Sequence, residues 1–137
     1  MHAAISELLE QHEQLRAMID RCEQLADAVD AGTAAPDVLA RTLVRLRVAF
    51  DHHNKAEEHQ LRPLLRDSGA FAAVRIDRMV SDHVEEHRVM RQRFENCPTT
   101  QLRETLARLR DHLASEERYF LSARIVRDDL VVIEGGG

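Results

Sequence analysis

The chain has 137 residues, a length typical of a single domain that buries its own apolar core without disulfides or oligomerisation. Its net charge is −5, and the 24 acidic and 19 basic side chains are interleaved, which excludes the basic surface that nucleic acids and anionic membranes require. Because no N-terminal basic stretch precedes an apolar core, and no run approaches the roughly 20 apolar residues of a membrane span, we expect a cytoplasmic protein.

The first predicted helix covers residues 3–29, where apolar residues recur at intervals of three and four, the period of an amphipathic helix. Its stripe contains Ile5, Leu8, Leu9, His12, Leu15, Ile19, Cys22, Leu25 and Val29. A loop at 30–36 follows, and a second helix begins near Asp37. The second stripe contains Leu39, Leu43, Leu46, Phe50, His53, Glu57, Leu61 and Leu64. Pro63 is expected to loosen or end the final turn, because proline lacks a backbone N–H.

The third predicted helix follows a break at 67–69 and ends at 96–98. Its stripe contains Phe71, Val74, Val80, His83, His87, Met90 and Phe94. Thr99 or Thr100 is expected to cap a fourth helix. The fourth stripe contains Leu102, Leu106, Leu109, His112, Glu116 and Phe120. Short connections between long helices predict an all-α fold, an up-down-up-down antiparallel four-helix bundle over residues 1–123.

The C-terminal tail, residues 124–137, contains β-branched residues and ends in three glycines that we expect to be disordered. We expect this short tail to lie over the end of the bundle, and a dimer contact is the alternative, because a short apolar segment is ambiguous by periodicity. The chain is therefore expected to be a monomer or a weak homodimer.

Five of the eight histidines fall within the apolar stripes. The stripes carry His12, His53 with Glu57, His83 with His87, and His112 with Glu116. Two residues four apart on an α-helix differ by about 40° of rotation and roughly 6 Å of rise, so both side chains of such a pair can reach one centre. One pair alone is common on exposed surfaces, but all these residues are in phase with the leucines, which predicts burial. The other histidines are out of phase and are expected to be solvated: His2, His52 and His59.

Burial of five imidazoles and two carboxylates requires compensation. Each uncompensated ionised group would cost several kcal/mol, against a net stability of roughly 5–15 kcal/mol for a domain. Metal coordination removes this cost, and nitrogen and oxygen donors without thiolates suit iron, with manganese or zinc as alternatives. Seven ligands are too many for one tetrahedral zinc ion, and they suit two metal ions that share the carboxylates. Cys22 and Cys97 lack Cys-x-x-Cys spacing and are expected to be free thiols.

These residues carry a resemblance to a known family. Residues 53–64 read His-Asn-Lys-Ala-Glu-Glu-His-Gln-Leu-Arg-Pro-Leu, similar to the His-x-x-x-Glu-Glu-x-x-Leu-x-Pro signature of the hemerythrin-like, or HHE cation-binding, four-helix bundles. The further matching motifs are His12-Glu13, His83-x-x-x-His87 and His112-x-x-x-Glu116-Glu117. Together the motifs extend the resemblance over roughly residues 5–122, nearly the whole chain.

The resemblance implies a cofactor of two iron ions (Fe²⁺/Fe³⁺) joined by an oxo or hydroxo bridge. It implies that His83, His87 and His112 bind one iron, that His12 and His53 bind the other, and that Glu57 and Glu116 bridge the two. The second iron would then have an open coordination position, where the oxygen carriers of the family bind dioxygen. Leu9, Phe50 and Leu109 precede ligands by one turn and are candidates for an apolar wall that excludes water.

Alternative interpretations remain at three points. Glu117 competes with Glu116, because the last carboxylate in the family's invertebrate oxygen carriers stands one residue further from its histidine; the four-residue spacing of His53 and Glu57 favours Glu116. A ferritin-like site is disfavoured, since no histidine has an acidic residue three positions before it. The segment 83–87 also matches the His-x-x-Glu-His motif of inverted zinc peptidases, which would leave three buried histidines unexplained.

We expect the protein to bind dioxygen or a related small oxidant for storage, delivery or sensing. The alternative is a di-iron enzyme that decomposes peroxide or oxidises a small substrate, so the sequence leaves open whether the protein is an enzyme. Tyr119, the single tyrosine, is expected to cap a polar pocket, and donation of a proton or a radical is the alternative.

Overall fold

The computed structural model describes residues 2–69, 71–95 and 97–118, and it is built from four α-helices. They are α1 (His2–Asp30), α2 (Pro36–Ser68), α3 (Ala73–Glu95) and α4 (Leu102–Glu116), the last preceded by the 3₁₀ turn η1 (Thr99–Gln101). The described residues contain no strand, and the predicted all-α fold of four helices is confirmed. None of the described helices combines the length and the apolar character needed to cross a membrane.

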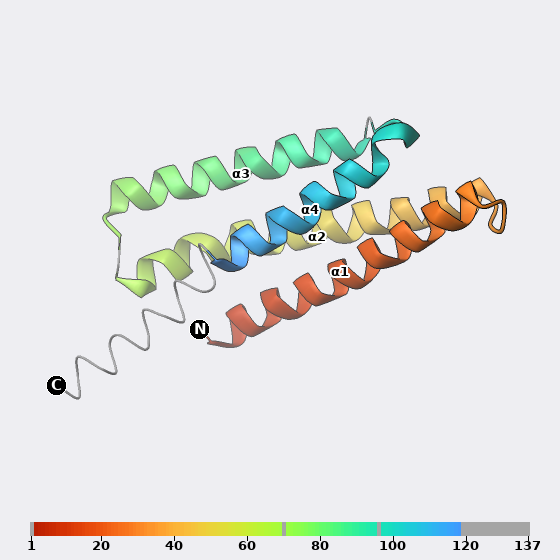
Figure 1. The fold of residues 1–137 in the computed structure, drawn as a ribbon. Coiled ribbons are helices and arrows are strands. Elements are labelled where there is room, and N and C mark those ends of the chain that lie inside the picture. The colour runs from red at the N-terminus through yellow and green to blue at the C-terminus, as the bar shows by residue number, and fades with distance from the viewer. Residues whose placement is uncertain (1, 70, 96, 119–137) are drawn as a thin grey trace.

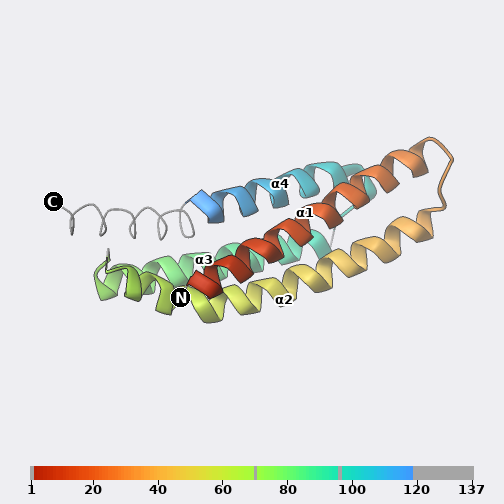
Figure 2. The ribbon, with the colours of Figure 1, turned by 90° about the horizontal axis from the view of Figure 1, so that it is seen from below.

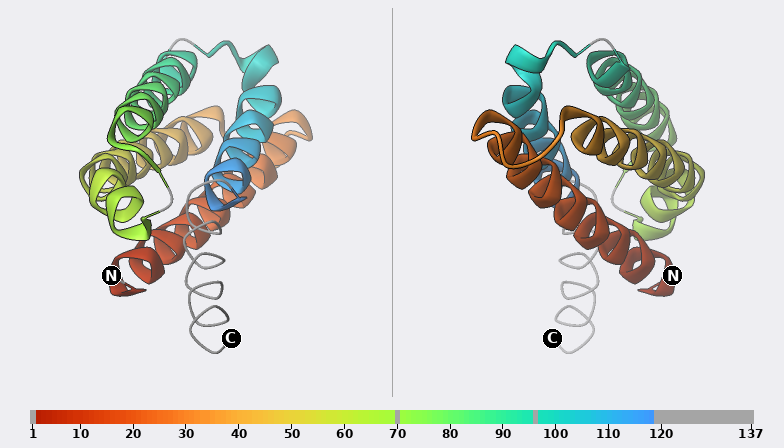
Figure 3. Two further views of the ribbon diagram at one scale, coloured as in Figure 1. Left: turned by 90° about the vertical axis from the view of Figure 1, so that its left-hand side faces the viewer. Right: turned by 90° about the vertical axis from the view of Figure 1, so that its right-hand side faces the viewer.

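The helices lie side by side, and successive helices run in opposite directions (Figures 1 and 2). α1 packs against α2 and α4, and α3 packs against the same two helices. Views from the two ends show α1 and α3 at opposite corners of the bundle (Figure 3). Every helix therefore has one stripe that faces the bundle interior, where side chains from all four helices meet.

The apolar core is divided along the bundle. The large cluster occupies the end near the α1–α2 loop and includes the fully buried Leu46, Phe50 and Leu106. Two small clusters lie towards the other end, one around Leu8 and one around Leu61. In α1, α2 and α3 the buried histidines and glutamates fall between these clusters along the sequence, and in α4 His112 and Glu116 lie at the end of the large cluster, on either side of Leu113. The bundle thus holds a polar layer between apolar layers, and that layer needs its own source of stability.

Pro63 does not end α2, which excludes one of the two outcomes expected for this residue. The helix continues to Ser68, where Gly69 closes it with a left-handed φ of 67° and donates its N–H to the Arg66 carbonyl. An internal proline costs about 3 kcal/mol. Leu64 and Leu65, which follow Pro63, are both buried, and each contributes roughly 1.5–3 kcal/mol, enough to offset the missing hydrogen bond.

Two further expectations about helix stripes and ends are corrected. Thr99 and Thr100 do not cap α4 but form the 3₁₀ turn, which Gln101 closes by donating its N–H to the Pro98 carbonyl at 2.9 Å. Val74 is 77 % exposed, and Ile76 is the buried residue at the start of α3. Tyr119, Phe120, the boundary at 123 and the tail 124–137 lie outside the described residues, as does the side chain of His2.

Candidate metal centre

All seven predicted ligands point into the bundle from four different helices. His12 comes from α1, His53 and Glu57 from α2, His83 and His87 from α3, and His112 and Glu116 from α4. Six of them are at most 3 % exposed, and the side chain of His112 is 8 % exposed. His52 and His59 are exposed, as predicted. The histidines that follow the helical spacing of the leucines are therefore buried in the bundle interior, as the leucines are.

Each glutamate directs its two oxygens to two different sets of histidines. Glu57 Oε2 lies 3.0 Å from His53 Nε2 and 3.5 Å from His12 Nε2. Its other oxygen, Oε1, contacts His83 Nε2 and lies 3.5 Å from His87 Nε2. One carboxylate thus reaches α1 and α2 on one side and α3 on the other.

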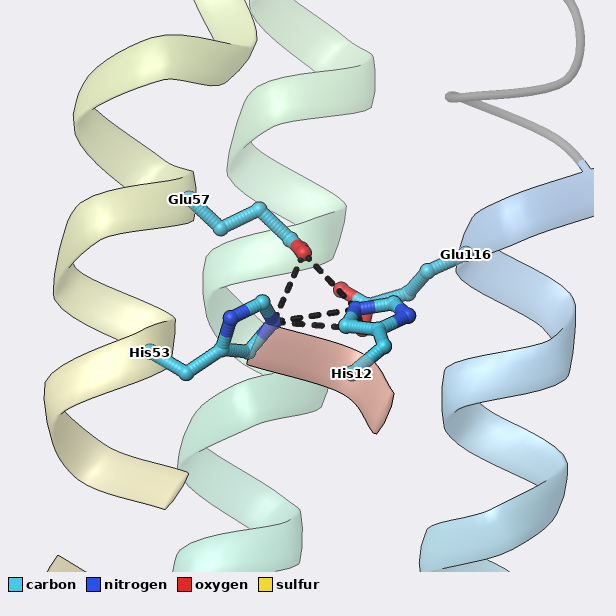
Figure 4. A group of neighbouring side chains, drawn as sticks. All are labelled: His12, His53, Glu57 and Glu116. Atoms are coloured by element: carbon cyan, nitrogen blue, oxygen red, sulfur yellow. Dashed lines mark hydrogen bonds and ion pairs between the residues drawn. The ribbon is translucent and has the colours of Figure 1, made fainter. Parts of the chain in front are cut away.

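Glu116 repeats this arrangement from α4. Its Oε2 lies 2.6 Å from His83 Nε2 and 3.1 Å from His87 Nε2. Its Oε1 lies 3.3 Å from His12 Nε2 and 4.0 Å from His53 Nε2. Figure 4 shows Glu57 and Glu116 approaching the imidazoles of His12 and His53 from opposite sides. The two carboxylates therefore lie between two histidine pairs.

The donor atoms form two compact groups that share both glutamates. One group consists of His12, His53, Glu57 and Glu116, the other of Glu57, His83, His87 and Glu116. Within each group the donor atoms lie within 4.8 Å of one another. His112 belongs to neither group; its Nε2 lies 3.4 Å from Glu116 Oε1, and its ring centroid is 5.1 Å from that of His87.

Three buried atoms of the centre lack a hydrogen-bond partner within the described part of the chain. They are Glu57 Oε2, Glu116 Oε1 and His112 Nε2. In addition, His12 Nε2 and His53 Nε2 lie 3.0 Å apart, a distance that requires a proton or a cation between the two nitrogens, because their lone pairs would otherwise repel each other. Buried lone pairs that converge in this way fit a positive ion among them.

The comparison with known proteins agrees with this geometry. The hemerythrin HHE cation-binding domain matches residues 3–123. The chain belongs to this family. No curated protein and no solved structure matches the chain. A hemerythrin HHE domain binds metal cations, and the buried histidines and glutamates are the groups that can hold one here.

The zinc-peptidase interpretation fails on geometry. In the motif at 83–87 the glutamate that would act as general base is Glu86, which is 59 % exposed. It lies 3.8 Å from His83 Nδ1, the nitrogen opposite to the one that faces Glu57 and Glu116. Glu86 is therefore outside the HHE centre, on the outer side of His83.

Outer hydrogen bonds orient three of the imidazoles. His12 Nδ1 lies 2.7 Å from Glu117 Oε2, His53 Nδ1 lies 2.7 Å from Gln11 Oε1, and His87 Nδ1 lies 2.9 Å from Glu58 Oε1. Each Nδ1–H donates outwards, which leaves Nε2 to face the centre.

The outer bonds also distinguish the two candidate bridging glutamates. Glu117 is 29 % exposed, accepts hydrogen bonds from His12 and Arg16, and lies outside the ring of ligands, whereas Glu116 is 2 % exposed inside it. The sequence-based preference for Glu116 agrees with this placement. The roles of Gln11 and Glu58 were not predicted. The doublets Glu57-Glu58 and Glu116-Glu117 nevertheless follow one rule: the first glutamate faces the centre, and the second contacts the outer nitrogen of a histidine.

The glutamates control the protonation of the imidazoles. Burial by itself would lower the pKa of His12 and His87, but contacts with Glu116 and Glu57 outweigh it and raise each pKa to about 10. The same balance raises the pKa of His83 to about 9. At neutral pH the metal-free centre therefore holds protons between carboxylate and imidazole, in the positions that a cation would take.

The remaining titratable ligands follow the same logic. Burial would raise the pKa of Glu57, but its contacts with Glu116 and with the histidines hold that pKa well below the usual range. Burial lowers the pKa of His112 to about 4. This imidazole is therefore neutral at pH 7, and one of its ring nitrogens has a lone pair that can coordinate a metal ion.

Apolar side chains cover one end of the centre. The Phe50 ring is fully buried, and its centroid lies 6.2 Å from those of both His87 and His112. Leu109 is fully buried in the same cluster, whereas Leu9 packs with Leu8 and Leu64 at the opposite end. Cys22 and Cys97 are free thiols, and neither is among the grouped donors.

Proposed function

We propose that this HHE protein holds two iron ions between its four helices and uses them to bind dioxygen or a related small oxidant. The observation that carries the proposal is the double orientation of Glu57 and Glu116, each with one oxygen towards each histidine pair. A single ion would use both glutamates and one histidine pair, and the other histidine pair would remain buried without a metal ion.

The donor set supports iron. Imidazole and carboxylate donors suit a borderline cation, and an iron pair held by them would supply the electrons that dioxygen binding requires. We assign His12 and His53 to one ion, His83 and His87 to the other, and the two glutamates to both. His112 is proposed as the third nitrogen beside His83 and His87, because its ring lies 5.1 Å from His87 and 5.9 Å from His83.

The side chains of this chain would perform three tasks. The glutamates neutralise positive charge in the bundle interior. Gln11, Glu58 and Glu117 hold the imidazoles in the tautomer that presents Nε2. Phe50 and Leu109 keep bulk water from one end of the centre, which protects reduced metal from side reactions.

A second function is favoured by a specific observation. A cleft between α3 and α4 reaches His83 and Glu116, and it is lined by the polar side chains of Ser115 and Glu86. Access for small polar solutes is what an enzyme that decomposes peroxide requires, whereas a reversible carrier requires a dry pocket.

The two functions are separated by one experiment. Apoprotein is loaded with Fe²⁺ without oxygen, the bound iron is counted, and dioxygen is added while the visible absorption is recorded. A new absorption that disappears under vacuum supports a carrier, and rapid bleaching with turnover of added peroxide supports the enzyme. Less than about one iron per chain, or no loss of iron in His53→Ala, would contradict the centre itself.

A further inference from the structure

The cleft between α3 and α4 has a volume of about 420 Å³ and ends on the candidate metal centre. α3 contributes Arg75, Asp82 and Glu86 to its walls, and α4 contributes Ser115. At its inner end lie His83 and Glu116, two of the predicted ligands. By contrast, the apolar cavity of about 290 Å³ near Leu39 and Phe94 is lined by none of the seven ligands.

Several surface carboxylates near this cleft and elsewhere are paired with an arginine. Glu85, the neighbour of Glu86, lies 2.5 Å from Arg88, and Asp27 and Asp30 share Arg103. Asp82 and Glu86 form no ion pair with an arginine or lysine in the described part of the chain. Neither negative charge is therefore cancelled by an arginine or a lysine. Glu86 Oε2 lies 3.8 Å from Nδ1 of His83, an imidazole that must give up its extra proton when a metal ion binds.

The single arginine of the cleft lies apart from this acidic pair. Arg75 precedes Asp82 by two helical turns, and its guanidinium carbon lies 5.4 Å from the centroid of the Phe71 ring. The mouth beside Asp82 and Glu86 therefore has a negative potential that attracts cations, and the low-dielectric walls of a cleft strengthen such a field.

The inner end can receive a cation. Glu116 is 2 % exposed, and its Oε2, the oxygen directed towards α3, lies 2.6 Å from His83 Nε2, so one oxygen donor and one nitrogen donor lie together at this end. A divalent ion with six waters occupies roughly 200 Å³, given about 30 Å³ for each water. The volume of the cleft, about 420 Å³, is therefore larger than the volume of the hydrated ion.

We infer that the α3–α4 cleft is the route by which an aquated divalent cation reaches the centre, drawn in by Asp82 and Glu86 and received by His83 and Glu116. The inference rests on the proposed metal centre. A metal site in a bundle interior needs a path for its ion, and this cleft joins solvent to two of the ligands.

The test measures how fast apoprotein takes up Co²⁺, by stopped-flow absorption at low ionic strength. We expect Glu86→Gln and Asp82→Asn each to slow uptake about fivefold, because a divalent ion gains twice the Coulomb energy of a monovalent one. The difference should shrink at about 1 M salt, where the Debye length is about 3 Å. The amount of Co²⁺ finally bound by Asp82→Asn at saturating metal should not change. Glu85→Gln is the matched control, since Glu85 is 58 % exposed on the same helix but does not line the cleft.

A steric variant tests the route independently of charge. Ser115→Leu narrows the cleft and should slow uptake at every salt concentration, with an unchanged far-UV circular dichroism spectrum. Uptake by Asp82→Asn and Glu86→Gln at the rate of Glu85→Gln, at low salt, would overturn the inference and leave the centre intact. If the native apoprotein takes up no Co²⁺ at all, the proposed centre itself fails.

Discussion

The substitution Glu116→Gln keeps the shape of a buried side chain and removes its charge. Glu116 lies 2.6 Å from His83 Nε2 and 3.3 Å from His12 Nε2, so the change affects both groups of donors. Breaking a buried charge pair costs about 3–5 kcal/mol, and about 1.4 kcal/mol corresponds to a factor of ten in affinity. We therefore expect the affinity for Fe²⁺ to fall at least about a hundredfold.

Glu117→Gln is the matched control, because it makes the same chemical change one residue later. Glu117 contacts the outer nitrogen of His12 at 2.7 Å and is 29 % exposed. Removing an outer partner of a ligand typically costs about 10–100-fold in metal affinity, and partial exposure places this residue near the lower value.

The assay is equilibrium competition for Fe²⁺ between the apoprotein and a coloured chelator, without oxygen. Bound iron per chain and the far-UV circular dichroism spectrum are recorded for each variant. If Glu117→Gln weakens binding as much as Glu116→Gln, or more, the assignment of Glu116 as the shared carboxylate is refuted.

Three further outcomes follow from the protonation and packing of the centre. Coordination requires neutral imidazoles, and the pKa values of His12, His83 and His87 are about 10, 9 and 10, so metal binding at pH 7 should release close to three protons. Calorimetry in two buffers of different ionisation enthalpy measures this number, and release of less than one proton would contradict the pKa shifts. Because these pKa values are raised above the unfolded value of 6.5, their contribution to the stability of the apoprotein is complete below pH 6.5 and is lost as the pH rises towards 10. The urea midpoint of the apoprotein should accordingly fall between pH 6.5 and 9.5, and a constant midpoint would count against the argument. Finally, Phe50→Ala should lower the free energy of unfolding by about 3–5 kcal/mol, whereas Val48→Ala, at a 61 % exposed site on the same helix, should change it by less than about 0.5 kcal/mol.

The position of each ligand within its own helix could be predicted from the sequence. A residue such as His53 is separated from Phe50 and Glu57 by three and four positions, and the pitch of the α-helix then places all three on one buried face. This local rule also distinguished His53 from the exposed His52. It holds because the phase of a stripe depends only on the sequence of that helix.

The partners across helices could not be predicted in this way. Gln11 is only partly buried, and its bond to His53 depends on how α1 is rotated against α2, which no single stripe specifies. The continuation of α2 past Pro63 also depends on packing between helices. Burial of Leu64 and Leu65 by neighbouring segments outweighs the local free-energy cost of the proline. Tertiary packing thus decides what local periodicity leaves open.

The number of ions that the centre holds is the most direct test of the account. Titration of the apoprotein with Fe²⁺ in the absence of oxygen should end at two ions per chain, because Glu57 and Glu116 each direct one oxygen to each of two histidine pairs. A clear endpoint at one ion per chain, with no further uptake, would contradict a shared centre.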